Sequence, residues 1–498
     1  MLYTISPVDM QQLEKEYMSK YEIPGALLME HAALAVCDAI ARHAPQGGRA
    51  LFLCGPGNNG GDGYAAARIW KQRGGRCAII ELTGSLHGDA QMNRTLALQC
   101  GVAMLAADSI ASLPGCDVIV DALFGTGLSR APEGHAQKLI RLANDSGKPI
   151  VAVDIPSGLF GLDGHAPGDV ICAAETVTFH RPKHGLLLGQ GAETVGRLTV
   201  APILIPQGEG SYSGMAMLTP EDIPDLLPPR PRSAHKGTFG KTVIFAGSRG
   251  MAGAAALSAN AAVRSGSGLT TILCRESILP ILQTLCPAAV CVPLPEADGC
   301  LTGEAAVIAA GQLKSASSAV IGCGLGQSDD LLPVLNVFRQ ATCPVIWDTD
   351  ALNLLAVNRD LMPLPANAVV TPHPGEASRL LDCSIAQITA DMPAALRLLH
   401  EATGAHVLLK DARTLMTDGS RVAVNPIGTP ALSRGGSGDI LTGILGALLA
   451  QQRTLNAETL TLMQLAAYLH AAAAIRASEA LGEYCVTPED VIRSIRLA

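Results

Sequence analysis

Aromatic side chains are scarce in this chain of 498 residues, and basic residues do not predominate. Aromatics make up 3% of the sequence and hydrophobic residues 48%, so the cores must be built mostly from alanine, leucine, valine and isoleucine. The formal net charge of −8 argues against the basic surface that nucleic-acid binding requires. We therefore expect no nucleic-acid partner.

Further absences concern the cellular compartment. No uncharged apolar run reaches the ~18 residues of a membrane span, and residues 1–7 lack the pattern of a signal peptide. The 14 cysteines include no CxxC pair and no spacing typical of a zinc site. These features predict a protein of the reducing cytoplasm without a membrane partner.

The length predicts two domains of ~200–300 residues each. The 52 glycines and 31 prolines are spread between strand-like and helix-like runs, as in α/β enzymes with many turns. Turn-rich segments at 206–211 and 227–232 interrupt this alternation. We expect a first domain over residues 1–210, a linker and domain entry over 211–235, and a second domain over 236–498.

The first half contains a strand, a glycine loop and a helix in succession. Residues 50–54 predict a buried strand, residues 55–63 contain five glycines, and residues 64–73 predict a helix. This order is typical of a nucleotide-phosphate site, although the loop is not GxGxxG. The side-chain carbonyls of Asn58 and Asn59 suit a hard cation such as potassium beside a pyrophosphate. A structural turn is the alternative, but a turn needs fewer glycines.

Two later strands of this half end in aspartate, at Asp121 after residues 118–120 and at Asp154 after residues 149–153. Sites of α/β proteins lie beyond the carboxyl ends of parallel strands, so both carboxylates should face the crevice of the glycine loop. Upstream, residues 9–43 predict a helix interrupted near Pro24, which we interpret as a packing or dimerisation arm.

Three motifs of this half, Asn-Asn-Gly-Gly-Asp-Gly, Phe-Gly-Thr-Gly-Leu and Val-Asp-Ile-Pro-Ser-Gly, together resemble the NAD(P)H-hydrate epimerase domain, which has a Rossmann-like fold. The resemblance covers residues 1–210. It implies that Asp154 is the acid/base and that Asn59, Asp121 and Ser157 ligate potassium. It also implies a nucleotide substrate held by Asn58, Asn59, Gly60, Gly61, Asp62, Gly125, Thr126, Gly127, Leu128, Ser129, Arg130 and Asp154.

The second half predicts another parallel α/β sheet with polar residues at its strand ends. Its strands are expected at residues 242–246, 269–273, 319–322, 344–348, 368–370 and 406–410. His373 lies between two prolines at a strand end, where it either faces a ligand or is a satisfied buried histidine. Residues 410–414 either supply amides and a cation to a phosphate chain or form a plain turn.

A polar, glycine-rich loop over residues 433–439 runs into an apolar helical segment over 440–449. Amides of the loop and of the first helical turn would form an anion site that the helix dipole reinforces. Asp439 lies at the mouth of this site. It either caps the helix or takes a proton from a hydroxyl that is being phosphorylated.

This loop, the Thr-Pro-His-Pro-Gly-Glu box and the Asp-x-Asp-Ala-Leu strand end resemble the ADP-dependent NAD(P)H-hydrate dehydratases, a ribokinase-like family, over residues 218–498. The resemblance implies that Asp439 is the base and that Gly253, Gly326 and His373 also face the hydrate. It implies AMP contacts at Lys410, Asp411, Ala412, Arg413, Thr414 and Gly438. The sequence departs from the usual pattern at Ser437 (commonly Thr), Thr349 (commonly Ala) and Asp411 (commonly Gly).

Taken together, the resemblances imply a bifunctional α/β repair enzyme with a Rossmann-like domain and a ribokinase-like domain. The first would interconvert the epimers of the hydrates NADHX and NADPHX, with K⁺. The second would dehydrate the S form with ADP and Mg²⁺ of unknown ligands, releasing AMP and phosphate. Alanine-rich helices permit a homo-oligomer, which we expect. The alternative is a ribokinase-like vitamin kinase fused to a non-catalytic nucleotide-binding or scaffold domain.

Overall fold

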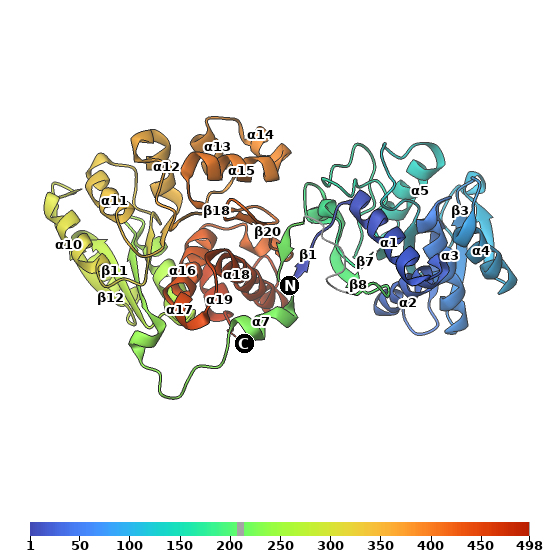
Figure 1. Ribbon diagram of the computed structural model, residues 1–498, viewed down its shortest axis with the longest axis horizontal. Coiled ribbons are helices and arrows are strands. Elements are labelled where there is room, and N and C mark those ends of the chain that lie inside the picture. Colours follow the sequence, from blue (N-terminus) through green and yellow to red (C-terminus); the bar gives the residue numbers. More distant parts are fainter. Residues whose placement is uncertain (207–213, 498) are drawn as a thin grey trace. The chain divides into compact units, whose positions relative to one another are not determined.

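The computed structural model of the protein describes residues 1–206 and 214–497. The chain forms two compact units, one of Tyr3–Met215 and one of Met1–Leu2 with Ala216–Ala498 (Figure 1). The expected domain boundary between residues 210 and 211 lies outside the described residues. The segment expected to be a linker, 211–235, includes a strand of the second unit's sheet, β9 (Ala216–Met217).

The first unit contains a sheet whose strand order is β4-β3-β2-β5-β6-β7-β8, with every pair of neighbours parallel. Because β2 is followed by β3 and β4 on one side and by β5 on the other, the strand order reverses between β2 and β5. Ligands of α/β proteins bind at such a switch point. The strands are β2 (Arg49–Cys54), β3 (Arg76–Glu81), β4 (Ala103–Ala106), β5 (Val118–Ala122), β6 (Ile150–Val153), β7 (Glu175–Phe179) and β8 (Arg197–Ala201).

Helices cover both faces of this sheet. Residues of α1, α2 and α3 share one hydrophobic core with the strands, and residues of α5 belong to a second core on other strand positions. The predicted interruption near Pro24 is confirmed, because α1 ends at Tyr21 and α2 begins at Gly25. The helices are α1 (Pro7–Tyr21), α2 (Gly25–His43), α3 (Asn58–Gln72), α4 (Gly88–Gln99) and α5 (Gly134–Asp145).

The sequence analysis missed β7, whose sequence Glu-Thr-Val-Thr-Phe alternates without a fully apolar face. Its acid is nevertheless buried, because Glu175 accepts hydrogen bonds from Arg42 Nη2 at 2.5 Å and from Thr199 Oγ1 at 2.6 Å. Paired and hydrogen-bonded in this way, a carboxylate can occupy a central strand. The strand matters because it leads directly to Lys183, a residue of the candidate site.

The second unit is built on a sheet of strand order β1-β9-β20-β19-β18-β17-β16-β15-β10-β11-β12, in which β1 is Leu2–Tyr3. The strands from β12 to β18 pair in parallel, as predicted, whereas β19 pairs antiparallel with both β18 and β20. Its main strands are β10 (Lys241–Phe245), β11 (Leu269–Arg275), β12 (Val290–Leu294), β15 (Ser318–Ile321), β16 (Val345–Trp347), β17 (Ala368–Val370), β18 (His406–Leu409), β19 (Leu415–Thr417) and β20 (Val422–Val424).

Three helices, α8 (Ala252–Arg264), α16 (Ser437–Ala450) and α18 (Thr459–Leu481), contribute many of the buried residues of this unit's hydrophobic core. Small residues allow α8 and α16 to approach closely: a Cβ on Gly443 would lie 2.1 Å from the carbonyl oxygen of Ser258. This packing fixes the start of α16, and with it Asp439, relative to the strand ends. Among the helices of the described residues, none combines the length and apolar character that crossing a membrane requires.

Candidate active sites

The first unit contains a cavity of about 630 Å³ beyond the carboxyl ends of β5 and β6. Its wall is completed by α1 and by the start of α3, so it lies at the switch point of the sheet. The cavity brings together most of the predicted substrate contacts. Those that line it are Asn58, Asn59, Asp62, Asp154 and the residues at 125–130.

Most of the predicted glycine loop at residues 55–63 is helical, so the loop that leads to the cavity is shorter than predicted. Helix α3 begins at Asn58, with Gly57 as its N-cap residue and no side-chain cap. Gly60 and Gly61 do not line the cavity. They permit close packing instead, because a Cβ on Gly60 would lie 1.9 Å from the Gly55 carbonyl oxygen and one on Gly61 would meet Met29. The uncapped amides of the first turn form an anion site at the cavity.

Asp154 is held in a fixed position at the cavity wall. It has a left-handed backbone conformation, with φ of 65°, and its side chain accepts from Lys183 Nζ at 2.5 Å and from Thr178 Oγ1 at 3.0 Å. Both hydrogen bonds end on Oδ1. A non-glycine residue in this conformation carries strain of about 1–3 kcal/mol, which is common at functional sites.

Lys183 is one site residue that sequence reasoning missed. It is almost fully buried, with 1% exposure, and its ammonium also donates to Thr178 Oγ1 at 3.2 Å and to the Phe179 carbonyl oxygen at 3.3 Å. A buried lysine that pairs with a carboxylate in a cavity wall is typical of a functional site. The run His-Arg-Pro-Lys after β7 would have indicated it, had that strand been recognised.

Two further acids line the same cavity, Glu14 from α1 and Asp62 from α3. Burial raises the pKa of Glu14 to about 6, with Lys183 opposing this shift and Asp154 adding to it. Burial and the nearby carboxylates of Asp154 and Glu14 raise the pKa of Asp62 well above its usual range. The helix expected to be only a packing or dimerisation arm therefore contributes an acid to the site.

Of the predicted potassium ligands Asn59 lines the cavity, whereas Asp121, which was expected to face it, and Ser157 are fully buried and do not line it. Ser157 donates to Asp121 from its backbone N–H at 2.7 Å and from its Oγ at 2.6 Å, and the Leu123 N–H donates to the same carboxylate at 3.2 Å. Burial raises the pKa of Asp121 to about 6, although these hydrogen bonds oppose the shift. Asn59 has a buried Nδ2 atom without a partner among the described residues.

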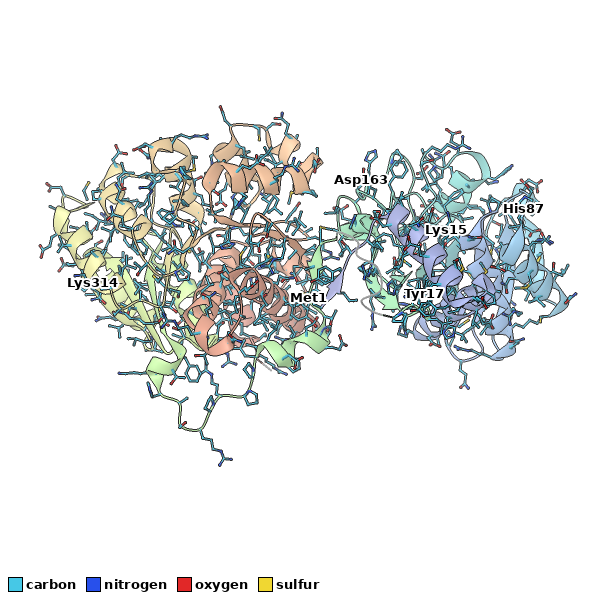
Figure 2. The ribbon with its side chains drawn as sticks, viewed as in Figure 1. Met1, Lys15, Tyr17, His87, Asp163 and Lys314 are labelled. Carbon is cyan, nitrogen blue, oxygen red and sulfur yellow. The ribbon has the colours of Figure 1, made fainter. Side chains whose placement is uncertain are left out.

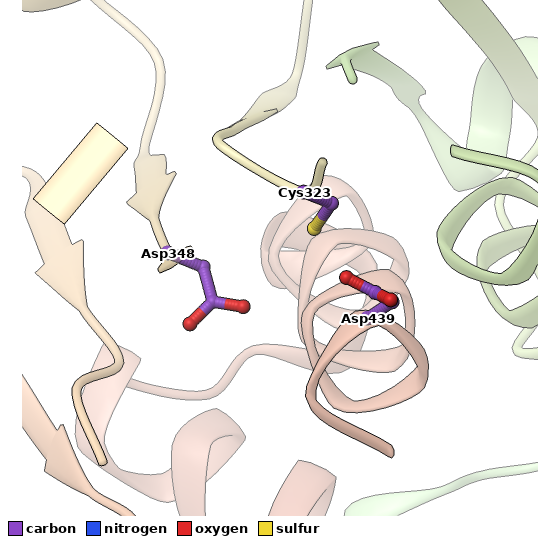
Figure 3. Close-up of side chains that lie close together, drawn as sticks. All are labelled: Cys323, Asp348 and Asp439. Atoms are coloured by element: carbon purple, nitrogen blue, oxygen red, sulfur yellow. The ribbon is translucent and has the colours of Figure 1, made fainter. Parts of the chain in front are cut away.

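The second unit brings two aspartates and a cysteine together at the strand ends. Figure 3 shows Cys323, Asp348 and Asp439, whose ligand atoms all lie within 4.8 Å of one another. Asp439 is the third residue of α16, and the N-cap residue is Gly436, with φ of 94°, so the capping interpretation of Asp439 is wrong. Burial raises the pKa of Asp439 to about 7, and the Asp348 carboxylate adds to the shift.

A lysine connects this cluster to the nucleotide loop. Lys410 Nζ donates to Asp348 Oδ1 at 2.7 Å and lies 3.9 Å from Glu376 Oε2. Burial alone would lower the pKa of Lys410, but these two carboxylates outweigh it and raise the pKa. Thr371 Oγ1 also donates to Asp348, while Asp348 Oδ2 has no partner among the described residues. The lysine therefore stays charged where the phosphates are expected.

His373 caps a helix and also faces a cavity. Its Nδ1 accepts from the Gly375 N–H at 2.9 Å at the start of α13 (Pro374–Leu381), and half of its side chain is exposed. It is therefore not a buried histidine. Burial and the positive charges of Lys410 and Arg379 lower its pKa, so the ring is neutral and can accept this hydrogen bond.

This cavity has a volume of about 350 Å³. It is lined by His373, by Ser437 and by most of the predicted nucleotide contacts, namely Lys410, Asp411, Ala412, Thr414 and Gly438. Arg413 does not line it. The structure also adds two residues that sequence reasoning missed, Asn425 and His470, which are both buried and lie in its wall.

The other two predicted hydrate contacts lie elsewhere in this unit. Gly253, at the start of α8, lines a separate cavity of about 470 Å³ with residues of α19 (Pro488–Arg493). The Gly326 N–H donates to Asp350 Oδ2 at 2.9 Å. The loop of Gly326 nevertheless packs against the start of α8, because a Cβ on Gly324 would lie 2.9 Å from that of Ala254.

Both units have a cavity at the carboxyl ends of a parallel sheet and beside the start of a helix. Acids of raised pKa line the first cavity, and Asp439 follows Gly438 of the second cavity's wall without itself lining it. These features define a two-domain α/β enzyme that acts on nucleotides. A family model described as NAD(P)H-hydrate dehydratase matches residues 242–497, and one described as YjeF-related protein N-terminus matches residues 25–185. The chain belongs to the family of bifunctional NAD(P)H-hydrate repair enzymes.

The similarity to one such relative extends over almost the whole chain. The bifunctional NAD(P)H-hydrate repair enzyme of Moorella thermoacetica is 36% identical over 99% of this chain and 95% of its own. Among solved structures, a ribokinase-like superfamily protein from Enterococcus faecalis covers 58% of this chain and 96% of its own, with 27% identity and a TM-score of 0.50. An ADP/ATP-dependent NAD(P)H-hydrate dehydratase from Bacillus subtilis, co-crystallised with ATP and Mg²⁺, covers 56% and 96%, with 27% identity and a TM-score of 0.49.

Proposed function

We propose that the unit of Tyr3–Met215 interconverts the epimers of hydrated NADH and NADPH, and that the second unit dehydrates one epimer with ADP. For the first activity the supporting observation is Asp154, held by Lys183 at the wall of a nucleotide-sized cavity. For the second it is Asp439, a carboxylate of raised pKa in the first turn of α16, beside the charged Lys410.

The epimerisation can be written with the groups of the first cavity. The hydrated ring carries a hydroxyl on the carbon next to the ring nitrogen, whose lone pair expels this group as water and leaves a planar iminium ion. Water then adds to the other face and inverts the centre. Asp154 would act on the proton of this water, since its Oδ1 is engaged by Lys183 and Thr178 while Oδ2 remains for a ligand.

Potassium would be held by Asn59, Asp121 and Ser157. The site fits a monovalent cation because the Asp121 carboxylate is buried without a cationic partner among the described residues. A carboxylate, a hydroxyl and an amide carbonyl are the oxygen ligands that hard cations prefer. The ion would supply positive charge beside the pyrophosphate of the substrate.

In the second unit Asp439 would take the proton of the substrate hydroxyl, whose oxygen attacks the terminal phosphorus of ADP as the bond to AMP breaks. The N–H groups at the start of α16 and the Lys410 ammonium would stabilise the transferring phosphoryl group. Phosphate is then a good leaving group from the ring carbon. Its elimination, with loss of a ring proton, restores the dihydropyridine.

A resident magnesium site does not fit the residues of this cluster. The Cys323 thiol is a poor ligand for a hard cation, and Asp348 Oδ1 is already paired with Lys410. Magnesium commonly keeps several waters and binds mainly through substrate phosphates. We therefore propose that Mg²⁺ enters with the nucleotide, and we assign no protein ligand to it.

All 14 cysteines are free thiols, which supports the proposed location in a reducing cytoplasm. We also propose that the partners are small-molecule nucleotides and that the protein acts as a homo-oligomer.

The experiment that tests the function supplies a mixture of both NADHX epimers with ADP. Near-complete recovery of the near-ultraviolet absorbance of NADH is expected. If only half of the hydrate is recovered, the proposed epimerase activity is contradicted. If no hydrate is recovered, the proposed dehydratase activity is contradicted.

Replacing Lys410 by Met should lower both the stability of the second unit and its affinity for the nucleotide. The change leaves the buried carboxylates of Asp348 and Glu376 without a counter-ion, which costs about 3–5 kcal/mol when one partner of a buried pair is removed. Denaturant unfolding monitored in the second unit measures this loss. Lys314→Met, on the exposed surface of the same unit, is the control and should change stability by less than about 0.5 kcal/mol.

His470→Ala should raise the KM for ADP about tenfold with little change in kcat. The ring lines the nucleotide cavity, has 7% exposure, and its Nε2 has no hydrogen-bond partner among the described residues. Burial lowers its pKa to about 4, so it is neutral and able to bond to a base or ribose. A lost hydrogen bond of about 1.4 kcal/mol corresponds to this factor. An unchanged KM would show that the nucleotide does not reach α18.

A further inference from the structure

The first cavity contains more acids than substrate binding explains. Glu14, Asp62 and Asp154 all line it, from α1, from α3 and from the end of β6. The proposed substrate carries a pyrophosphate, so each ionised carboxylate beside it raises the electrostatic energy of binding. An acid that is retained at such a position has a chemical role or is kept protonated.

Asp154 is held through one carboxylate oxygen, Oδ1, by two hydrogen-bond donors. The Lys183 ammonium donates to Asp154 Oδ1 at 2.5 Å, to Thr178 Oγ1 at 3.2 Å and to the Phe179 carbonyl oxygen at 3.3 Å. These contacts use the three hydrogens of the lysine. The Thr178 hydroxyl donates to the same carboxylate oxygen. An ion pair and a second donor both favour the ionised form of a carboxyl group.

The reaction needs a proton donor as well as a base. When the hydroxyl leaves, its oxygen gains a proton and departs as water with the electron pair of the C–O bond, while the nitrogen lone pair forms the C=N bond. When water adds to the opposite face, a new C–O bond forms, the C=N pair returns to nitrogen, and the water loses a proton. The two proton transfers occur on opposite faces of the ring, so one carboxyl group is poorly placed for both.

We propose that Glu14 is a catalytic acid of the epimerisation, protonating the hydroxyl that leaves toward α1 while Asp154 takes the proton of the incoming water. The assignment rests on the proposed epimerase function. After one turnover Glu14 is ionised and Asp154 is protonated. Proton exchange through water restores both groups, so no further reactant is consumed.

The surroundings of Glu14 suit this role. Its carboxyl interacts electrostatically with Lys183 and Asp154, and the other charged residues that line the cavity are Lys15 of the same helix, Asp62 and Arg130. With its pKa raised to about 6, chiefly by burial, Glu14 can give and regain a proton near neutral pH. Burial, with the carboxylates of Asp154 and Glu14, also raises the pKa of Asp62, so Asp62 is the competing proton donor that the test must separate.

Helix α1 holds this acid rigidly. Ser6 caps the helix by accepting from the Asp9 N–H at 3.0 Å, and Met10, Leu13 and Tyr17 are buried in the core of the unit. Gln11 Nε2 donates to Thr126 Oγ1 at 3.3 Å and so connects the helix to the substrate loop after β5. Tyr17 and Lys15, both labelled in Figure 2, lie on this helix on either side of Glu16. A rigid element positions a catalytic group better than a loop does.

The test uses the full chain with Glu14→Gln, which keeps the shape and removes the acid. The epimer that the dehydratase cannot use is supplied with ADP, and an excess of the Asp154→Asn chain provides dehydration, so that epimerisation limits the rate. We expect Glu14→Gln to lower kcat about 10²–10⁴-fold with KM changed less than threefold. Glu16→Gln, exposed on the same helix, is the matched control and should not change the rate.

The pH profile separates a catalytic from a structural role. Because Glu14 must be protonated, kcat/KM of the unaltered protein should fall as pH rises through about 6, and Glu14→Gln should lose this limb. Glu14→Asp keeps an acid and should retain more activity than Glu14→Gln.

If Asp154→Asn abolishes epimerisation and Glu14→Gln does not, the proposal is overturned and the epimerase function stands. If Asp62→Asn alone removes the limb, the donor is Asp62 and the proposal is also overturned. If the unaltered protein does not exceed the spontaneous rate of epimerisation, the epimerase function itself fails.

Discussion

Asp439→Asn should abolish the ADP-dependent dehydration and leave epimerisation unchanged. The substitution keeps the side-chain shape in the first turn of α16 but removes the group that would take the hydroxyl proton. Loss of general-base catalysis typically costs about 10²–10⁴-fold in rate. Because the carboxylate lies near Asp348, removing its charge should not destabilise the unit. The measurement is single-epimer dehydration with saturating ADP.

The pH dependence of the same reaction provides a second readout. The base must be ionised, and burial raises the pKa of Asp439 to about 7, so kcat/KM should rise with pH through about 7 in the free enzyme. Asp439→Asn should lose this rising limb along with the activity. Asp360→Asn, an exposed aspartate of the same unit, is the control and should keep both. Dehydration by Asp439→Asn within tenfold of the normal rate would refute the assigned base.

Asp154→Asn should abolish the catalysed epimerisation and leave the dehydration unchanged. With a mixture of epimers and ADP, recovery of NADH should show a fast phase for the usable epimer, followed by a second phase at the spontaneous epimerisation rate. The reason is that the amide cannot accept a proton from water. A profile with a single fast phase would show that epimerisation does not need Asp154.

The Asp154→Asn change also removes the partner of a buried lysine, and this effect must be separated from the chemistry. Leaving Lys183 buried and unpaired should cost about 3–5 kcal/mol of stability. The double change Asp154→Asn with Lys183→Met removes both charges. It should recover most of this stability, because apolar replacements of buried pairs are often neutral, and it should remain inactive. Recovery of activity with stability would show that Asp154 acts structurally.

Much of the architecture could be predicted from the sequence. The alternation of strands and helices, the parallel sheets and the positions of Asp121, Asp154 and Asp439 after strands or at a helix start follow from local apolar periodicity and from glycine and proline signals. Where such local signals were weak, the prediction failed. Strand β7 was missed because its acid, Glu175, is buried through an ion pair with a helix distant in sequence.

Other parts of the sites depend on contacts that no local pattern contains. The Asn-Asn-Gly-Gly run was expected to be a loop, yet it is helical, because its glycines provide room for neighbouring backbone and side chains. Arg413 lies in the predicted nucleotide run but not in the cavity wall, whereas Asn425 and His470 come from distant segments to complete that wall. The direction of a side chain at a strand end is set by the residues that pack against that strand end.

The sequence by itself determined the two α/β halves, the family and the acids at the strand ends, because these depend on residue types and on short-range spacing. Only the tertiary structure decided the protonation chemistry of the sites. Lys183 pairs with Asp154 at the cavity wall, α1 brings Glu14 to the same cavity, and Gly436 leaves Asp439 free of a capping role. Ion pairing and desolvation are set by groups that folding brings together from separate segments, and these interactions fix which acid holds a proton.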